Sequence, residues 1–166
     1  MRRLEAAAGS AGFLVAAPGV VAGVVPWLLT GWRSSDPPAS VALLGGALIA
    51  GGAGVLLHAF GRFVVEGRGT PAPIAPTERL VIGGLYRHVR NPMYVAVGTV
   101  IVGQALLLGR PLLLLYAAAF WLVVATFVRL YEEPTLSDRY GSEYSAYRRA
   151  VPAWWPRLRP WRQHES

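Results

Sequence analysis

The residues best suited to chemistry lie in the stretch YRHVRNPMY, which runs from Tyr86 to Tyr94 directly before an apolar run. Two arginines, a histidine, an asparagine and two tyrosines fall within these nine residues. Such groups beside hydrocarbon are costly unless they bind something. The stretch therefore predicts a binding site at the start of an apolar helix.

A second polar segment begins with Glu132 and Glu133, at the end of a later apolar run, and continues as a tail rich in tyrosine, arginine and tryptophan. The two polar segments are far apart in sequence. If the apolar runs between them form a membrane hairpin, both segments converge at the same membrane face. This convergence predicts a site that combines carboxylates, aromatic rings and arginines.

The composition is typical of a membrane protein. Of the 166 residues, 54% are hydrophobic and only 15% are charged, whereas about 25% of residues are charged in soluble domains. All sixteen basic residues are arginine, and this basic balance favours a membrane surface over nucleic acid as the partner. The absence of cysteine excludes disulfides and thiolate sites, and three scattered histidines do not form a metal site.

Four apolar runs predict an all-α integral membrane bundle with about four transmembrane helices. A span of hydrocarbon about 30 Å thick needs roughly 20 residues at 1.5 Å each. The runs cover residues 11–32, 40–61, 93–109 and 111–130. We expect the loop before Pro92 and the C-terminal tail to form a cytoplasmic cap, with the tail lying along the membrane.

Local sequence predicts the shape and packing of these helices. Pro18 and Pro26 fall inside the first run and predict a kink. In the second run, small residues one turn apart predict a close packing face, namely Ala47 with Gly51 and Ala50 with Gly54. The third and fourth runs are joined only by GRP, which predicts an antiparallel helical hairpin.

The arginines predict the orientation of the bundle. With a cytoplasmic N-terminus, fourteen arginines lie inside and only Arg33 and Arg110 lie outside, as the positive-inside rule requires. We therefore expect an integral protein of a prokaryotic cytoplasmic membrane, with both termini in the cytoplasm. The inside set is Arg2, Arg3, Arg62, Arg68, Arg79, Arg87, Arg90, Arg129, Arg139, Arg148, Arg149, Arg157, Arg159 and Arg162.

Together the two polar segments resemble the isoprenylcysteine carboxyl methyltransferase and phospholipid methyltransferase superfamily of integral membrane enzymes. Its pattern is Gly-x-Tyr, then Arg-His-Pro-x-Tyr, a membrane hairpin, Glu-Glu-x-x-Leu, an aromatic-Gly pair, spaced tyrosines and Val-Pro. The resemblance covers residues 67–156 and implies a single membrane-embedded methyltransferase domain over residues 1–166. The matching positions are Gly84, Tyr86, Arg90, Asn91, Pro92, Tyr94, Glu132, Glu133, Leu136, Tyr140, Gly141, Tyr144, Tyr147, Val151 and Pro152.

The resemblance implies transfer of a methyl group from S-adenosylmethionine to a lipophilic or lipid-linked acceptor at the cytoplasmic membrane face. The acceptor group is a carboxylate, as in isoprenylcysteine, an amine, as in a phospholipid, or a thiol. S-adenosylmethionine carries a sulfonium, an amino-acid head and an adenosine, so its site needs a carboxylate and aromatic surface. Carried over from the family, the cofactor residues are Arg79, Leu80, Val81, Tyr86, Asn91, Pro92, Met93, Tyr94 and Glu132.

The candidates for the reaction itself are Arg90, Arg129 and Glu133. Methyl transfer is an in-line displacement, so positioning in a dry pocket supplies most of the rate, and an acceptor that is already ionised needs no general base. Asn91 stands where the prenylcysteine enzymes have histidine and cannot act as a titrating base. The substrate arginine of those enzymes falls on Val128, and Arg129 lies one residue later.

Other interpretations compete with these. Membrane sterol reductases, which use a nicotinamide cofactor, carry a similar motif and tail, and a small membrane scaffold that binds anionic lipids is a non-enzymatic alternative. Arg87, His88 and Arg90 would then be a cluster that binds headgroups. No obligate protein partner is inferred.

Individual residues also leave alternatives open. Glu132 and Glu133 could simply pair with arginines, and His58 is more typical of a helix end than of a ligand. Gln104 suggests either an interhelical hydrogen bond or a substrate path. We expect the apolar part of the acceptor to enter along the third and fourth runs, near Gly98 and Gly103.

Overall fold

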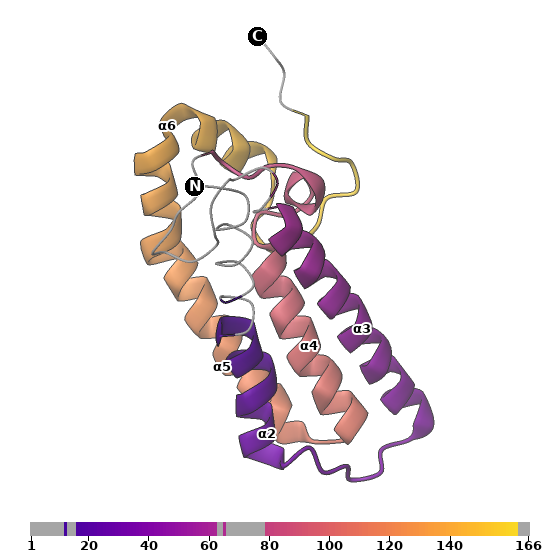
Figure 1. The fold of residues 1–166 in the computed structure, drawn as a ribbon. Coiled ribbons are helices and arrows are strands. Elements are labelled where there is room, and N and C mark those ends of the chain that lie inside the picture. The colour runs from indigo at the N-terminus through magenta and orange to yellow at the C-terminus, as the bar shows by residue number, and fades with distance from the viewer. Residues whose placement is uncertain (1–11, 13–15, 63–64, 66–78, 163–166) are drawn as a thin grey trace.

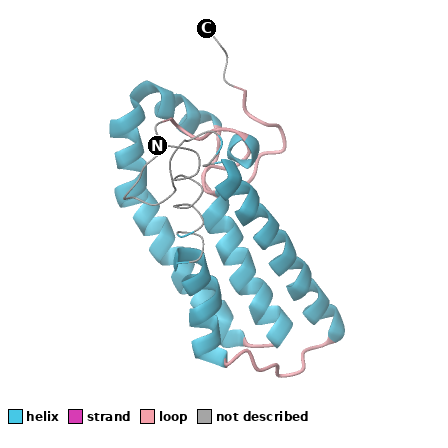
Figure 2. Ribbon diagram, viewed as in Figure 1, coloured by secondary structure: helices cyan, strands magenta, loops and turns pink. Residues whose placement is uncertain are grey.

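The computed structural model describes residues 12, 16–62, 65 and 79–162, and these residues contain helices and loops but no strand (Figure 1, Figure 2). The predicted all-α class is therefore confirmed for the described chain. The elements in chain order are η1 (Val20–Val24), α2 (Val25–Thr30), α3 (Ala39–Arg62), η3 (Gly84–Arg87), α4 (Pro92–Leu108), α5 (Pro111–Phe127), η4 (Val128–Glu132) and α6 (Glu133–Ala150).

Helices α3 and α4 pack side by side through glycines (Figure 1). A Cβ added at Gly45 would lie 2.4 Å from Leu107 N, and one at Gly103 would lie 2.8 Å from Gly45 O. Gly52 approaches α4 in the same way, with a Cβ only 2.9 Å from Ala96 O. Backbones this close leave no room for side chains, so the two helices depend on these three glycines.

The packing face predicted on α3 was placed on the wrong glycines. Gly51 and Gly54 have nothing within 4 Å of an added Cβ. The true contact positions, Gly45 and Gly52, are seven residues apart and therefore share one side of the helix. Several pairs of small residues occur on this helix, and spacing alone did not identify the pair that faces α4.

The predicted hairpin between residues 93–109 and 111–130 is present, with α4 and α5 joined by Gly109 and Arg110. Gly109 ends α4 in the left-handed conformation, with φ of 62°, and Pro111 begins α5. Arg110 Nε donates to Arg33 O at 2.8 Å. The two arginines expected outside the membrane thus contact each other, from the loops that join α2 to α3 and α4 to α5. Figure 1 shows these loops at the end of the bundle opposite α6.

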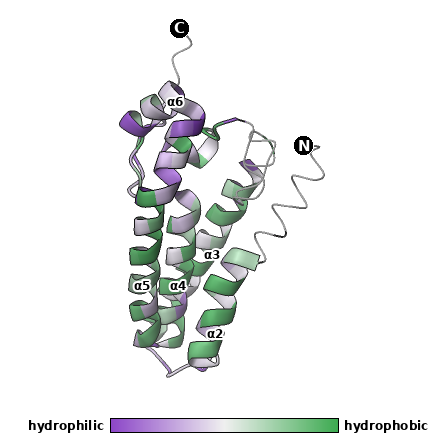
Figure 3. Cartoon of the chain, turned by 90° about the vertical axis from the view of Figure 1, so that its left-hand side faces the viewer, coloured by the Kyte–Doolittle hydropathy of each residue, from purple (hydrophilic) through white to green (hydrophobic). Residues whose placement is uncertain are grey.

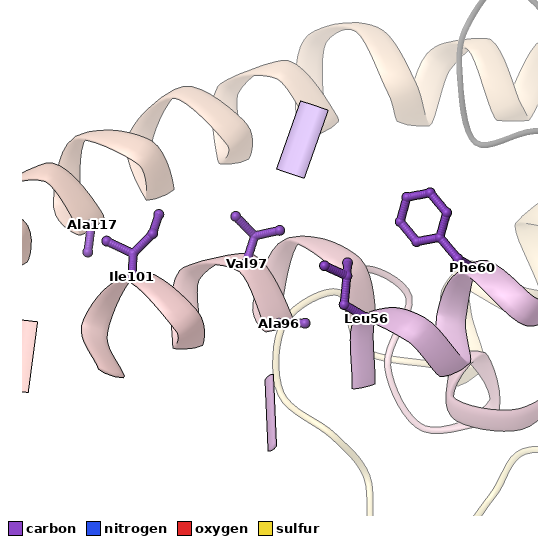
Figure 4. Close-up of a cluster of buried hydrophobic side chains, with 6 residues drawn as sticks. All are labelled: Leu56, Phe60, Ala96, Val97, Ile101 and Ala117. Atoms are coloured by element: carbon purple, nitrogen blue, oxygen red, sulfur yellow. The ribbon is translucent and has the colours of Figure 1, made fainter. Parts of the chain in front are cut away.

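The core lies where α3, α4 and α5 meet. Its buried side chains, drawn in Figure 4, are Leu56, Phe60, Ala96, Val97, Ile101 and Ala117. Large apolar side chains also point outward, among them Leu43 on α3 and Leu122 on α5, which are 75% and 70% exposed. In Figure 3 the helices are apolar along most of their length and the end that carries α6 is polar. An apolar exterior of this kind suits contact with hydrocarbon.

Two helical stretches of the described chain are long and apolar enough to cross a membrane, namely Ala39–Arg62 and Pro111–Ala150. The helices Ala16–Thr30 and Pro92–Leu108 are apolar but shorter. The fold is thus all-α with at least two candidate spans. The predicted number of four spans stays a prediction.

The first apolar helix contains a π-helical turn, η1, between the two prolines expected to kink it. In this turn Val25 N–H donates to Val20 O, and Pro26 has no N–H to donate. Two backbone oxygens instead accept side-chain hydrogen bonds from other helices. Tyr116 OH donates to Val21 O, and Gln104 Nε2 donates to Ala22 O, both at 2.6 Å. Of the two alternatives for Gln104, the interhelical hydrogen bond is confirmed.

The last helix continues α5 without interruption through a second π-helical turn, η4, into α6. In η4, Glu133 N–H donates to Val128 O across one residue more than in an α-helix. Helix α6 then breaks at Gly141, whose φ of 54° and ψ of −123° suit glycine alone. The break turns the chain back, so Tyr144 and Tyr147 pack with Val151 in a buried cluster.

Candidate functional site

The polar stretch before α4 is bonded to the C-terminal tail along its backbone. Arg90 N donates to Pro152 O at 2.9 Å, and Asn91 N donates to Ala153 O at 3.2 Å. Further along, Arg157 N donates to His88 O at 2.9 Å. The segment after α6 therefore runs along residues 87–91 and holds them in place, which forms a cap from two parts of the chain as predicted.

The side chains of this stretch bind the same tail. Arg87 Nε donates to Trp161 O at 2.7 Å, and Arg90 Nε donates to Val151 O at 2.9 Å. Asn91 Nδ2 donates to Ala153 O at 3.1 Å. His88 Nδ1 lies 2.7 Å from Arg157 O, and because a carbonyl only accepts, Nδ1 carries the proton in this hydrogen bond. Much of the polar character that first indicated a ligand site is thus used to fix the tail.

Arg90 also joins α4 to α6. Its guanidinium pairs with Glu133 Oε1 and donates to Tyr144 OH at 3.1 Å. Glu133 Oε2 lies 3.0 Å from Arg148 Nη2, so both oxygens of this carboxylate face an arginine. The side chains of Arg90 and Glu133 are 11% and 10% exposed. A buried charge needs such a partner, so this pair holds α6 against the start of α4.

Glu132 has a different environment from its neighbour. Tyr94 OH donates to Glu132 Oε2 at 2.8 Å. Within the described part of the chain, Glu132 takes part in no ion pair. It lines a pocket, whereas Glu133 does not. The structure thus separates two adjacent glutamates, since Glu133 is paired with arginines and Glu132 lies in the pocket lining.

The pocket lies between the N-terminal helix and the bundle of α3, α4 and α5, at the end that carries α6. Polar groups gather at one part of it, where Glu132, Tyr94 and Asn91 lie. Arg90 and Tyr86 also line the pocket, and the other lining residues are apolar and include Phe60 from α3 and Phe120 from α5. The full lining is Ala17, Pro18, Val21, Phe60, Tyr86, Arg90, Asn91, Pro92, Met93, Tyr94, Val97, Phe120 and Glu132. A pocket of this kind suits an amphipathic ligand or two ligands of opposite polarity.

A glycine of the predicted motif determines the conformation of the segment that carries Tyr86. Gly84 has φ of 57°, and an added Cβ would lie 2.6 Å from His58 Nε2 and 2.7 Å from Arg62 Nε. The sequence Gly-x-Tyr therefore needs glycine for its backbone angle and for its contact with α3. His58 packs against this turn.

The backbone of Tyr86, two residues after this glycine, is hydrogen-bonded to α6. Its carbonyl oxygen accepts a hydrogen bond from Tyr147 OH at 2.7 Å. Burial raises the pKa of Tyr147, which lies in the polar second half of α6, so this hydroxyl remains a neutral donor. The ring of Trp161 packs on the ring of Tyr147, with ring centroids 5.6 Å apart.

Most of the predicted site residues lie in the pocket lining, and a smaller group does not. The lining contains Tyr86, Arg90, Asn91, Pro92, Met93, Tyr94 and Glu132. Leu80 packs on the cluster of Tyr144 and Tyr147, and Val81 packs with Tyr86 and Ala59. Arg79 is exposed, and Arg129 is exposed on η4 beside the buried Val128. The roles predicted for all twelve residues, inside and outside the lining, stay predictions.

Several lining residues were absent from the predicted set. Val21 comes from the N-terminal helix, Phe60 from α3 and Phe120 from α5. All three are ordinary apolar residues in apolar helices, so the sequence carries no signal that distinguishes them. Only the packing of the N-terminal helix across the bundle brings them to the pocket.

Comparison with known proteins confirms the family resemblance. The family model described as phospholipid methyltransferase matches residues 41–143, more than half of the chain. The matched range begins in α3 and ends in α6, and it includes Tyr86, Tyr94 and Glu132. Comparison with curated proteins and with solved structures gives no significant match.

Proposed function

Because the chain belongs to the phospholipid methyltransferase family, we propose that it is a membrane enzyme that transfers a methyl group from S-adenosylmethionine to a lipophilic or lipid-linked acceptor. The cofactor supplies a methyl group activated by a sulfonium cation. The protein's own contribution is to bind this cation, to orient the acceptor and to exclude water.

The observation that carries this proposal is the carboxylate of Glu132. It lies in the pocket lining without an ion pair among the described residues, beside the phenol rings of Tyr94 and Tyr86. A carboxylate and aromatic faces together attract an organic cation. The residues that would hold the cofactor are therefore Glu132, Tyr94, Tyr86 and the segment Asn91–Met93.

Arg90 and Glu133 have a positioning role in this proposal. Their buried pair connects the start of α4, which carries Tyr94, to the start of α6, which follows Glu132. Neither side chain needs to move a proton. If the acceptor is an amine, it has to be unprotonated before it can attack, whereas a carboxylate or thiolate is ready at neutral pH.

The apolar part of the pocket indicates an amphipathic acceptor. Val21 on the N-terminal helix, Val97 on α4 and Phe120 on α5 form an apolar wall beside the polar end. We propose that the acceptor's chain lies here. The route expected near Gly103 is not retained, because Gly103 faces the backbone of α3 and leaves no space for a chain.

We further propose four membrane-spanning helices with the site at the cytoplasmic face. The eleven described arginines of the predicted inside set all belong to the end of α3, the segment 79–91 before α4, η4, α6 or the tail, whereas Arg33 and Arg110 lie at the opposite end. This charge asymmetry supports an orientation with both termini in the cytoplasm.

Cofactor titration of the purified protein tests the proposal. S-adenosylmethionine should bind, and Glu132→Gln should weaken its binding by roughly ten- to a hundredfold, because a charge-assisted contact contributes about 1.5–3 kcal/mol. Glu143→Gln, on the exposed face of α6, is the matched control and should bind normally. Binding of a nicotinamide cofactor instead would favour the reductase, and binding of neither would favour the scaffold.

A further inference from the structure

The tail beyond α6 exposes large apolar side chains next to arginines. Trp155 is 81% exposed and Leu158 is 98% exposed. Arg159 and Arg162 are exposed in the same segment. Side chains of this size are seldom left in water, and their combination with arginine is typical of a segment that lies in the interface of a membrane.

The ring of Trp154 places this segment beside the apolar part of the bundle. Trp154 packs on Trp121 of α5, with ring centroids 4.9 Å apart. Trp121 lies six residues before the end of α5 at Phe127, which is about 9 Å along the helix axis. Trp154 thus reaches the side of α5, and Trp155 follows it directly in the chain.

The charge around the tail suits an anionic partner. Arg149, Arg159 and Arg162 are exposed, and none of them takes part in an ion pair within the described part of the chain. Arg157, in contrast, is occupied, because its Nη1 donates to Ala150 O at 2.7 Å. Exposed arginines that form no ion pair with a described residue remain available for phosphate oxygens.

We propose that residues 152–162 form a membrane-surface anchor. Trp155 and Leu158 enter the boundary between headgroups and acyl chains, while Arg159 and Arg162 bind the phosphates of anionic phospholipids. The partner is the surface of the bilayer that surrounds the helices. An arginine near an anionic surface contributes about 1 kcal/mol, so the two arginines together shift the equilibrium roughly 30-fold toward the bound tail.

The anchor connects the composition of the bilayer to the pocket. Pro152 O and Ala153 O hold the backbone of Arg90 and Asn91, which line the pocket. A tail bound to lipid therefore stabilises the polar wall of the site, and a tail released into water loosens it. This inference concerns the tail alone and does not depend on the identity of the methyl acceptor.

A single label measures the position of the tail. The chain has no cysteine, so Leu158→Cys carries the only nitroxide label on the full-length protein reconstituted in bilayers. Its accessibility to a water-soluble paramagnetic nickel chelate is compared in phosphatidylcholine alone and in phosphatidylcholine mixed with phosphatidylglycerol. Ser142→Cys, exposed beyond the break in α6, is the control and should stay accessible in both bilayers.

The proposal expects the label at residue 158 to be shielded from the chelate in the anionic bilayer and more accessible in phosphatidylcholine alone. Adding Arg159→Gln and Arg162→Gln should abolish this difference between the two bilayers. A label that is accessible in both bilayers would show that the tail is not a membrane anchor. An acidic protein would then be the better candidate for the partner of this surface. Equal shielding in both bilayers would overturn the binding of anionic headgroups.

Discussion

Tyr94 OH donates a hydrogen bond to Glu132 Oε2 at 2.8 Å, although the two residues are 38 positions apart in the chain. Tyr94 lies in the first turn of α4, and Glu132 ends the π-helical turn that follows α5. This contact therefore joins the two ends of the hairpin formed by α4 and α5. It fixes the carboxylate at the edge of the pocket and presents the phenol ring beside it.

The contribution of this contact can be separated into two parts. Tyr94→Phe removes only the hydroxyl and should weaken S-adenosylmethionine binding by about two- to tenfold, since one hydrogen bond contributes roughly 0.5–1.5 kcal/mol. Tyr94→Ala also removes the ring and should weaken binding further. Isothermal titration of both variants measures the difference. Equal affinities for the two variants would mean that the ring does not contact the cofactor.

We expect Arg90 and Glu133 to contribute mainly to the stability of the folded protein. Arg90→Met leaves the buried Glu133 with one arginine and should lower the free energy of unfolding by about 3–5 kcal/mol. The double change Arg90→Met with Glu133→Gln should cost less than the sum of the single changes. Denaturant unfolding in detergent measures these values, with the exposed Arg149→Met as the control. A stable Arg90→Met protein that lacks methyl transfer would instead support the predicted catalytic role.

Much of this site could be predicted from the sequence, because the motif residues lie close together along the chain. The spacing of Tyr86, Asn91 and Tyr94 places them in one turn and one helix start, so their common location follows from short-range geometry. The apolar runs likewise predicted α3, α4, α5 and the hairpin within a few residues. Helices and turns predicted from such short-range patterns are present in the structure because no contact with a distant part of the chain favours another conformation.

Other features depend on contacts that no local pattern specifies. The backbone oxygens bound by Arg87, His88 and Asn91 belong to a tail about seventy residues away, so these side chains looked available for a ligand. The difference between Glu132 and Glu133 likewise arises because Arg90 and Arg148 pair with Glu133 alone. The glycines that face α4 could be chosen only once the rotation of α3 was known.

Gly103 provides a test of the packing between α3 and α4. Gly103→Leu would force a side chain against Gly45 O and Ile49, and overpacking of this kind costs about 3 kcal/mol or more when backbone has to move. Gly51→Leu is the matched control, because Gly51 has open space around it. Thermal unfolding followed by circular dichroism compares the two. A Gly103→Leu protein as stable as the control would contradict the close contact of the helices.

The acceptor's place in the pocket can be tested from the N-terminal helix. Val21 lines the apolar end, whereas Leu28, on the same helix, is 68% exposed and lies outside the lining. Val21→Trp should fill this end and strongly reduce methyl transfer to a long-chain acceptor, while S-adenosylmethionine binding at Glu132 stays within about twofold. Leu28→Trp should leave both methyl transfer and S-adenosylmethionine binding unchanged. Transfer is measured with radiolabelled cofactor by counting methyl groups in the lipid phase of reconstituted membranes. Loss of cofactor binding in Val21→Trp, or normal transfer despite the filled end, would show that the acceptor's chain does not lie against the N-terminal helix.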